Sequence, residues 1–219
     1  QGKNLVGSFL QPRIVLNDVS ILSSLPANEM KSGYGEILKY GLLRGDKEFV
    51  WMEKNLSAIM NHDRDALVEV IRMGCETKAS IVSEDERDKG KRALVNLGHT
   101  FAHAFETFAG FGRFQHGLSV GLGVIAAGLL SEKTGFCPEG ITDRVKKHAD
   151  DAGMPISLQS LHSETTWIKE ELYQKMMHDK KTVNGRINFV LLEELGKPFV
   201  CNTVCKEMVL ETLAEIGAV

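Results

Sequence analysis

The stretch LSVGLGVIAAGLL, residues 118–130, is the longest apolar run in the chain, and it decides the fold. It is shorter than the roughly 20 residues that a helix needs to span a bilayer. It contains three glycines, and the polar residues SEK follow it directly. These features predict a helix buried inside a globular protein rather than a membrane span.

The residues on the N-terminal side of this run carry three histidines. NLGHTFAHAFE occupies residues 96–106, and QHGLSVG, residues 115–121, leads into the apolar run. A helical wheel over residues 92–108, at about 100° per residue, gathers the polar groups on one face: Arg92, Asn96, His99, His103 and Glu106. The opposite face is apolar and consists of Leu97, Phe101, Ala104, Phe105 and Phe108. The pattern predicts one helix with a core face and a chemically reactive face, with Arg92 either on this helix or just before it.

Histidines at positions i and i+4 of a helix can bind one zinc ion, so the spacing by itself suggests His99 and His103 as ligands. A third ligand would come from elsewhere in the chain, and His116 and Glu36 are candidates. The alternative is that the histidines are polar positions in a packed helix, because HxxxH spacing often occurs by chance. The arginine and the asparagine on the same predicted face favour a metal site.

The rest of the chain is mostly helical in pattern. Apolar periodicity predicts further helices over residues 27–44, 46–62, 64–84, 139–153, 163–181 and 206–217. Residues 13–18, RIVLND, predict a short strand, and residues 185–204 predict a β-hairpin around EELGKP. The fold class is therefore mainly α, with several helices, a short N-terminal strand and a late β-hairpin. Gly33, Gly35 and Gly41 in the first helix each cost about 1 kcal/mol relative to alanine, which indicates close packing or the approach of a ligand.

Composition limits the classes of function. The chain has 219 residues and a net charge of −3, which disfavours a general surface for nucleic acid or anionic membranes. The four cysteines form no CxxC pair, so we expect reduced thiols in a cytoplasmic protein. The sequence begins with Gln1 instead of Met, and we expect it to be part of a longer chain.

Four motifs together resemble 3-dehydroquinate synthase. GYGEILKYGLL, DERDKGKRALVNLGHTFAHAFE, QHGLSVGLG and DKKTVNGRINFVLL occur in the order and at the spacing typical of that family. The resemblance covers nearly the whole chain but only the C-terminal part of the enzyme. It implies an N-terminal NAD-binding domain outside this sequence, with residues 1–25 as the interdomain, NAD-contacting segment. Residues 26–219 would form the helical domain that binds metal and substrate.

The family resemblance implies specific roles for residues of this chain. Enzymes of this family convert the seven-carbon sugar phosphate DAHP into 3-dehydroquinate, in the shikimate pathway, with NAD and a divalent metal, zinc or cobalt. The implied metal ligands are Glu36, His99 and His116, and the implied catalytic residues are His103, Lys39 and Asn96. Cations for the substrate's carboxylate and phosphate would be Lys78, Arg92, Lys180 and Lys181, and Lys3 and Ser24 would contact NAD. The full-length enzyme is expected to be a homodimer, and the isolated domain is expected to be inactive.

Three alternatives stay open at the level of sequence. Another sugar-phosphate cyclase would share the scaffold and the metal ligands. A metal-dependent polyol dehydrogenase of similar two-domain design would need the metal but not the phosphate-binding cations. A helical module without catalytic function would use its histidines only in packing.

Overall fold

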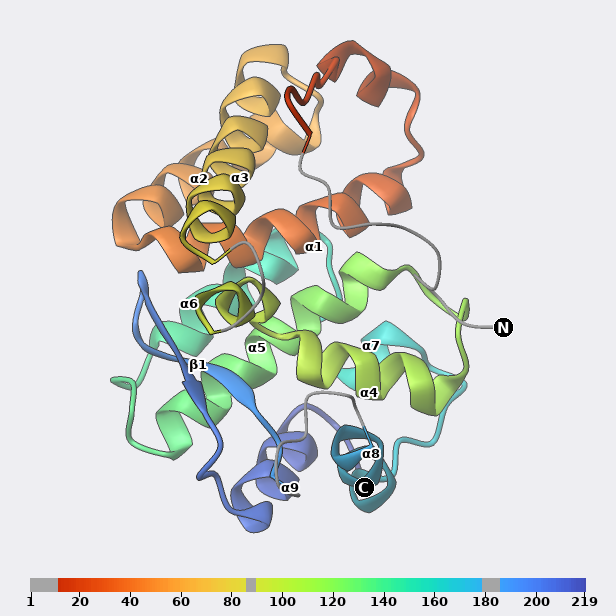
Figure 1. Cartoon of the computed structure of the whole chain (residues 1–219). Helices are drawn as coiled ribbons and strands as arrows, with labels where there is room; N and C mark the ends of the chain where they lie inside the picture. The colour runs from red at the N-terminus through yellow and green to blue at the C-terminus, as the bar shows by residue number, and fades with distance from the viewer. Residues whose placement is uncertain (1–11, 86–89, 179–185) are drawn as a thin grey trace.

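The computed structural model describes residues 12–85, 90–178 and 186–219 (Figure 1). Its helices are η1 (Val19–Ser24), α1 (Ala27–Arg44), α2 (Asp46–Met60), α3 (Arg64–Glu84), η2 (Lys91–Asn96), α4 (His99–Ala109), α5 (His116–Lys133), α6 (Ile141–Asp151), α7 (Leu158–Leu161), α8 (Lys169–Met177) and α9 (Lys206–Glu215). Two strands, β1 (Phe189–Glu194) and β2 (Lys197–Cys201), form an antiparallel hairpin. The prediction of a mainly helical fold with a late hairpin is confirmed.

Helix α5 contains the apolar run of residues 118–130 and lies in the middle of the molecule (Figure 1). Thirteen of its 18 residues are buried, so it presents almost no solvent face. It packs against α1, α4, α6, α9 and β1. A helix that is apolar on all sides is stable only when other elements surround it, and here they do. In the part of the chain that the structure describes, no helix is long and apolar enough to cross a membrane.

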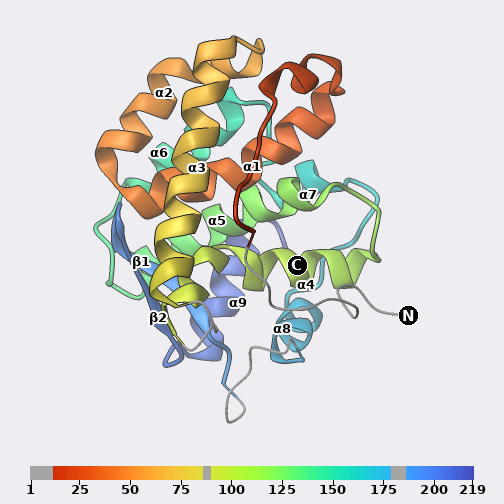
Figure 2. The same ribbon diagram turned by 45° about the horizontal axis from the view of Figure 1, so that its top comes forward.

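Helices α1 and α4 are the two closest neighbours of α5. Helices α2 and α3 pack against α1, and Figure 2 shows α3 running down the front of the molecule toward η2. The first residues of α4 and α5 and the middle of α1 therefore come together at one end of the α5 helix. This arrangement positions the candidate site.

The β-hairpin covers the other end of α5. Residues Phe189 to Leu192 of β1 are buried, and the amide of Leu192 donates to the hydroxyl of Ser131 on α5 at 3.0 Å. The turn carries Gly196 at φ +85°, and its amide donates to the carbonyl of Leu42 on α1 at 2.8 Å. The hairpin is thus tied to both α5 and α1.

Two predictions about local structure away from the histidines are wrong. Residues 13–18 form no strand, and Ile14, Val15 and Leu16 are 71%, 63% and 83% exposed. A strand needs a neighbour for its backbone hydrogen bonds, and no other strand pairs with this segment in the described residues. The helix predicted to begin at Ser163 begins instead at Lys169, because residues 163–168 place Trp167 in the core and pair its carbonyl with the amide of Val219.

Candidate metal and substrate site

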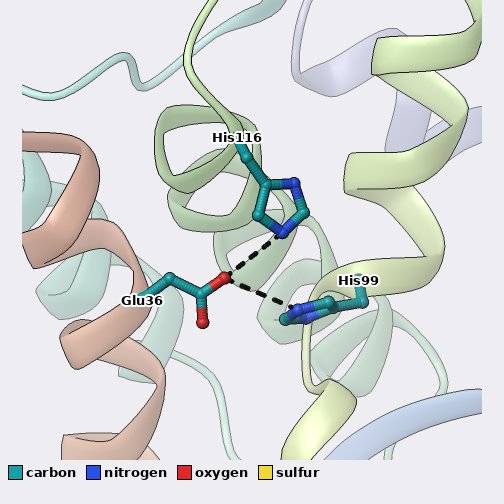
Figure 3. A group of neighbouring side chains, drawn as sticks. All are labelled: Glu36, His99 and His116. Carbon is teal, nitrogen blue, oxygen red and sulfur yellow. Dashed lines mark ion pairs between the residues drawn. The ribbon is translucent and has the colours of Figure 1, made fainter. Parts of the chain in front are cut away.

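Three side chains from three helices meet at one point. Glu36 lies in the middle of α1, His99 is the first residue of α4, and His116 is the first residue of α5. Their ligand atoms all lie within 4.8 Å of one another. Glu36 Oε1 is 3.3 Å from His116 Nε2 and 3.6 Å from His99 Nε2, as Figure 3 shows. The three residues that the family resemblance singled out as metal ligands therefore form one compact group.

The geometry of this group fits a divalent metal ion. Zinc prefers nitrogen and oxygen ligands at about 2.0–2.1 Å in a tetrahedral arrangement, which separates any two ligand atoms by roughly 3.3 Å. The two distances from Glu36 to the histidines, 3.3 and 3.6 Å, are near that value, and no pair of ligand atoms is more than 4.8 Å apart. One carboxylate and two imidazoles also leave a coordination position for substrate or water, as catalytic zinc sites do.

Glu106 on α4 orients His116. Its Oε1 accepts a hydrogen bond from His116 Nδ1 at 2.7 Å, and the hydroxyl of Ser119 donates to the same oxygen at 3.3 Å. With Nδ1 held in this way, Nε2 points toward Glu36 and His99. The hydrogen bonds to Glu106 and then Glu36 raise the pKa of His116 to about 9, against the opposing effect of burial. A carboxylate behind a ligating histidine fixes the ring orientation and strengthens the ligand.

Lys39, one turn after Glu36 on α1, is paired with the other carboxylate oxygen. Its Nζ donates to Glu36 Oε2 at 2.6 Å, and the residue is only 3% exposed. Burial lowers the pKa of Lys39 although Glu36 opposes the shift. Burial also raises the pKa of Glu36, but the hydrogen bonds from His116 and Lys39 outweigh it and leave that pKa well below its usual range. Glu36 is therefore a carboxylate at any physiological pH.

His103 lies beside the group but is not one of the three clustered ligands. Its ring centroid is 5.6 Å from that of His99 and 6.1 Å from that of His116, and the His103 ring is nearly parallel to the His116 ring. Helical spacing alone suggested that His99 and His103 share a metal. The structure instead groups His99 with His116 and Glu36.

The prediction that Asn96 and His99 lie on one continuous helix is wrong, whereas the alternative that Arg92 lies before that helix is confirmed. Residues Lys91–Asn96 form the 3-10 helix η2, and Gly98 has φ +80°, so α4 begins only at His99. Arg92 and Asn96 therefore do not belong to the polar face of α4. The physical reason is the left-handed backbone at Gly98, which a helical wheel cannot represent because it assumes one uniform rotation per residue.

Arg92 instead shares a cavity with Lys78. The cavity has a volume of about 740 Å³, and its lining includes Pro12 and Val15 from the N-terminal segment. Lys78 lies on α3, and its positive charge contributes to the lowered pKa of Lys39. The fold thus brings Lys78 and Arg92, two of the predicted substrate-binding cations, to one cavity.

The remaining predicted residues are only partly described. Asn96 is the last residue of η2 and is half-buried. Ser24 ends η1, where its exposed hydroxyl donates to the carbonyl of Ile21 at 2.9 Å. Lys3, Lys180 and Lys181 lie outside the described residues. The role of Ser24 and Lys3 toward NAD stays a prediction.

Comparison with known proteins shows the family to which the chain belongs. The family described as "3-dehydroquinate synthase C-terminal" matches residues 33–182, a range that contains Glu36, His99 and His116. The chain belongs to the 3-dehydroquinate synthase family. It is similar to 3-dehydroquinate synthase of Rhodospirillum rubrum (42% identical, 97% of this chain and 55% of the relative) and to that of Caulobacter vibrioides (42%, 100% and 59%). The chain therefore spans little more than half the length of these relatives.

Solved structures show the same fold. A 2-deoxy-scyllo-inosose synthase in complex with carbaglucose-6-phosphate, NAD⁺ and Co²⁺ is 28% identical, with a TM-score of 0.77 over 98% of this chain and 59% of that one. A 2-epi-5-epi-valiolone synthase of Streptomyces hygroscopicus with NAD⁺ and Zn²⁺ is 22% identical, with a TM-score of 0.78 over 91% of this chain and 54% of that one. This chain thus shares its fold with part of two synthases that carry other names.

Proposed function

We propose that this chain is the metal- and substrate-binding part of a 3-dehydroquinate synthase, which converts DAHP into 3-dehydroquinate with loss of phosphate. The observation that carries the proposal is the meeting of Glu36, His99 and His116 from three helices inside the family match. Since the chain spans 55–59% of its relatives, the NAD-binding domain would come from the remainder of the full-length protein.

Glu36, His99 and His116 would hold a divalent metal ion, zinc or cobalt. When bound, the ion acts as a Lewis acid that makes a secondary hydroxyl of the substrate easier to deprotonate, while NAD takes up the hydride. The ligand chemistry and the spacing described above support this assignment, and the Co²⁺ and Zn²⁺ in the solved cyclase structures support the choice of metals.

The other residues would bind and orient the substrate. Lys78 and Arg92 present two cations to one cavity, which suits an anionic sugar phosphate because charge-assisted hydrogen bonds to carboxylate and phosphate are strong. Lys180 and Lys181 would add to this set. His103 and Asn96 would position the phosphate and its proton during elimination, and Lys39 would hold Glu36 in its charged form from behind.

The direct test is phosphate release from DAHP by the full-length protein with NAD and zinc. We expect turnover that depends on both cofactors. Arg92→Ala should raise KM for DAHP roughly 10- to 100-fold, because a hydrogen bond to a charged group contributes about 1.5–3 kcal/mol. Lys91→Ala is the matched control, since the Lys91 side chain is 70% exposed and pairs with Glu84. A full-length protein that releases no phosphate from DAHP would refute the proposal.

The 219-residue chain alone is expected to bind zinc but to form no 3-dehydroquinate with added NAD, because the domain that carries the hydride acceptor is absent. The full-length enzyme is expected to be a homodimer, and its mass in solution would test this. Activity of the isolated chain would contradict the proposed division of labour between the domains.

Another sugar-phosphate cyclase is the second candidate, because the 2-deoxy-scyllo-inosose synthase structure covers 98% of the chain. Glucose 6-phosphate and DAHP offered in parallel to the full-length protein separate the two candidates. A phosphate-free diol belongs in the same assay, since its oxidation would favour a polyol dehydrogenase.

A further inference from the structure

Each of the three grouped side chains is the sequence neighbour of a glycine. Gly35 precedes Glu36, Gly98 precedes His99, and Gly117 follows His116. Glycine weakens a helix by about 1 kcal/mol relative to alanine, so its presence in the interior of α1 needs a structural reason. At these positions the reason is contact between backbone and backbone, with α5 as the common partner.

Gly35 and Gly117 lie where α1 crosses α5. A Cβ atom on Gly35 would be 1.9 Å from the carbonyl oxygen of Gly117, and one on Gly117 would be 1.7 Å from the carbonyl oxygen of Ser32. The Ser32 hydroxyl also accepts a hydrogen bond from the Gly117 amide at 3.1 Å. The two backbones are therefore in direct contact one residue away from both Glu36 and His116.

Gly98 and Gly123 make a second contact of the same kind. A Cβ atom on Gly123 would lie 2.2 Å from the carbonyl oxygen of Gly98, and one on Gly98 would lie 2.6 Å from the amide nitrogen of Val124. Gly98 also has φ +80°, a conformation that L-residues with a side chain rarely adopt. This contact fixes the start of α4, and with it His99, against α5.

These contacts control distances on the scale that matters for a metal. Real Cβ atoms essentially never lie closer than 3.0 Å to such neighbours, so a methyl group on Gly35 would push the two backbones apart by about 1 Å. Metal–ligand distances tolerate deviations of roughly 0.2 Å. The neighbouring groups are backbone atoms, and no side-chain rotation can relieve the clash.

We propose that Gly35, Gly117, Gly98 and Gly123, with the Ser32 hydroxyl, are positioning residues that set the spacing of Glu36, His116 and His99. They act by letting the backbones of α1 and α4 touch α5 beside each ligand. This inference rests on the proposed role of the three residues in holding a metal.

The same helix provides matched controls. A Cβ atom on Gly33 would have no neighbour within 4 Å. A Cβ atom on Gly41 would meet the sulfur of Met52 at 2.4 Å, which is part of a flexible side chain and lies more than one turn beyond Glu36. Gly33→Ala thus makes the same chemical change in open space, and Gly41→Ala makes it in the core, where we expect the ligands to keep their places.

The test measures zinc affinity of the full-length protein by competition with a chromophoric chelator, together with the Tm of the metal-free form. We expect Gly35→Ala and Gly117→Ala to weaken zinc binding roughly 10- to 100-fold, which is the range seen when groups that orient metal ligands are lost. Gly33→Ala should bind zinc normally, and Gly41→Ala should lower Tm without lowering zinc affinity. Gly123→Ala should resemble Gly35→Ala.

Normal zinc affinity in folded Gly35→Ala and Gly117→Ala would overturn the inference, as would an equal loss of affinity in Gly41→Ala. Ser32→Ala removes the hydrogen bond to Gly117 without adding volume, and we expect it to weaken zinc binding a few-fold at unchanged Tm. If the glycine variants do not fold, Ser32→Ala decides alone, and normal affinity in that variant refutes the inference. A wild-type protein that binds no zinc would refute the proposed metal centre itself, which is a different outcome.

Discussion

The core of this protein is joined in two different ways. Where α1 and α4 meet α5, glycines bring backbones into direct contact beside the candidate metal ligands. Where α4 meets the segment before α8, aromatic rings fill the space instead. Trp167 stacks on Phe108 with ring centroids 5.5 Å apart and meets Phe105 edge-on at 6.1 Å.

The two kinds of contact have different consequences. Side chains can change rotamer and repack after a substitution, which costs stability but spreads the change over many atoms. Backbone contacts have no such freedom. Substitutions at the glycine contacts are therefore expected to impair function more than stability. Substitutions among the aromatic rings are expected to lower stability more than function.

The largest effect is expected for His99→Ala, which should impair metal binding and turnover but not stability. Removal of a ligand is expected to abolish stoichiometric zinc binding and to lower turnover of the full-length enzyme by about 10³-fold or more, since a metal contributes several kcal/mol to the transition state. Metal analysis and kcat measure both effects. The Tm of the metal-free protein should change little, and a large fall would place His99 among the residues that hold the fold.

Trp167→Ala should have the opposite effect and lower stability while leaving zinc affinity nearly unchanged. Trp167 is 2% exposed, and truncation of a buried large aromatic residue costs about 3–5 kcal/mol. Urea denaturation should show this loss in the free energy of unfolding, while zinc affinity of the folded protein stays within a few-fold of wild type. Trp51→Ala, at a partly exposed position on α2, is the control and should cost clearly less.

Glu106→Gln tests the orientation of a ligand without altering the ligand. The amide keeps the size of the side chain but loses the charge that holds His116 Nδ1 at 2.7 Å, so zinc affinity should fall 10- to 100-fold. Chelator competition measures it. Glu139→Gln, at an exposed position before α6, should leave the affinity unchanged, and an unchanged affinity in Glu106→Gln would contradict the orienting role.

The smallest expected effect concerns His148, which joins α6 to the far side of α1. The residue is 4% exposed, and its Nε2 is 2.7 Å from the hydroxyl of Tyr34. Burial lowers the pKa of His148, although Glu53 and Asp151 partly oppose this. The unfolded chain therefore takes up a proton more readily than the folded one as the pH falls below about 6.5.

The sign of the effect follows from this difference in proton uptake. The contribution of His148 to stability is fully present above about pH 6.5 and declines below it, by at most about 1.4 kcal/mol per pH unit. The free energy of unfolding at pH 7.5, 6.5 and 5.5 should fall more steeply in wild type than in His148→Gln. Parallel curves for the two proteins would contradict the prediction.

Much of the fold could be predicted from the sequence because helices follow a local rule. The period of apolar residues predicted the spans of α1 and α3 at both ends and nearly the span of α2, and the apolar run predicted most of α5. The β-hairpin was also predictable, since its two strands are joined by a short turn. Residues 13–18 were not, because a β-rich segment becomes a strand only when a second strand lies beside it.

The candidate site, like the fold, was predictable from the sequence only in part. The amino-acid sequence by itself determined a set of helices, a helix rich in buried glycine, and a motif set that names Glu36, His99 and His116. Only the tertiary structure decided that η2 is separated from α4 at Gly98, that Glu106 turns His116 toward Glu36, and that glycines bring α1 and α4 onto α5. The reason is physical: a helix forms from contacts three and four residues apart, whereas Gly35 and Gly117 meet only after the intervening chain has folded.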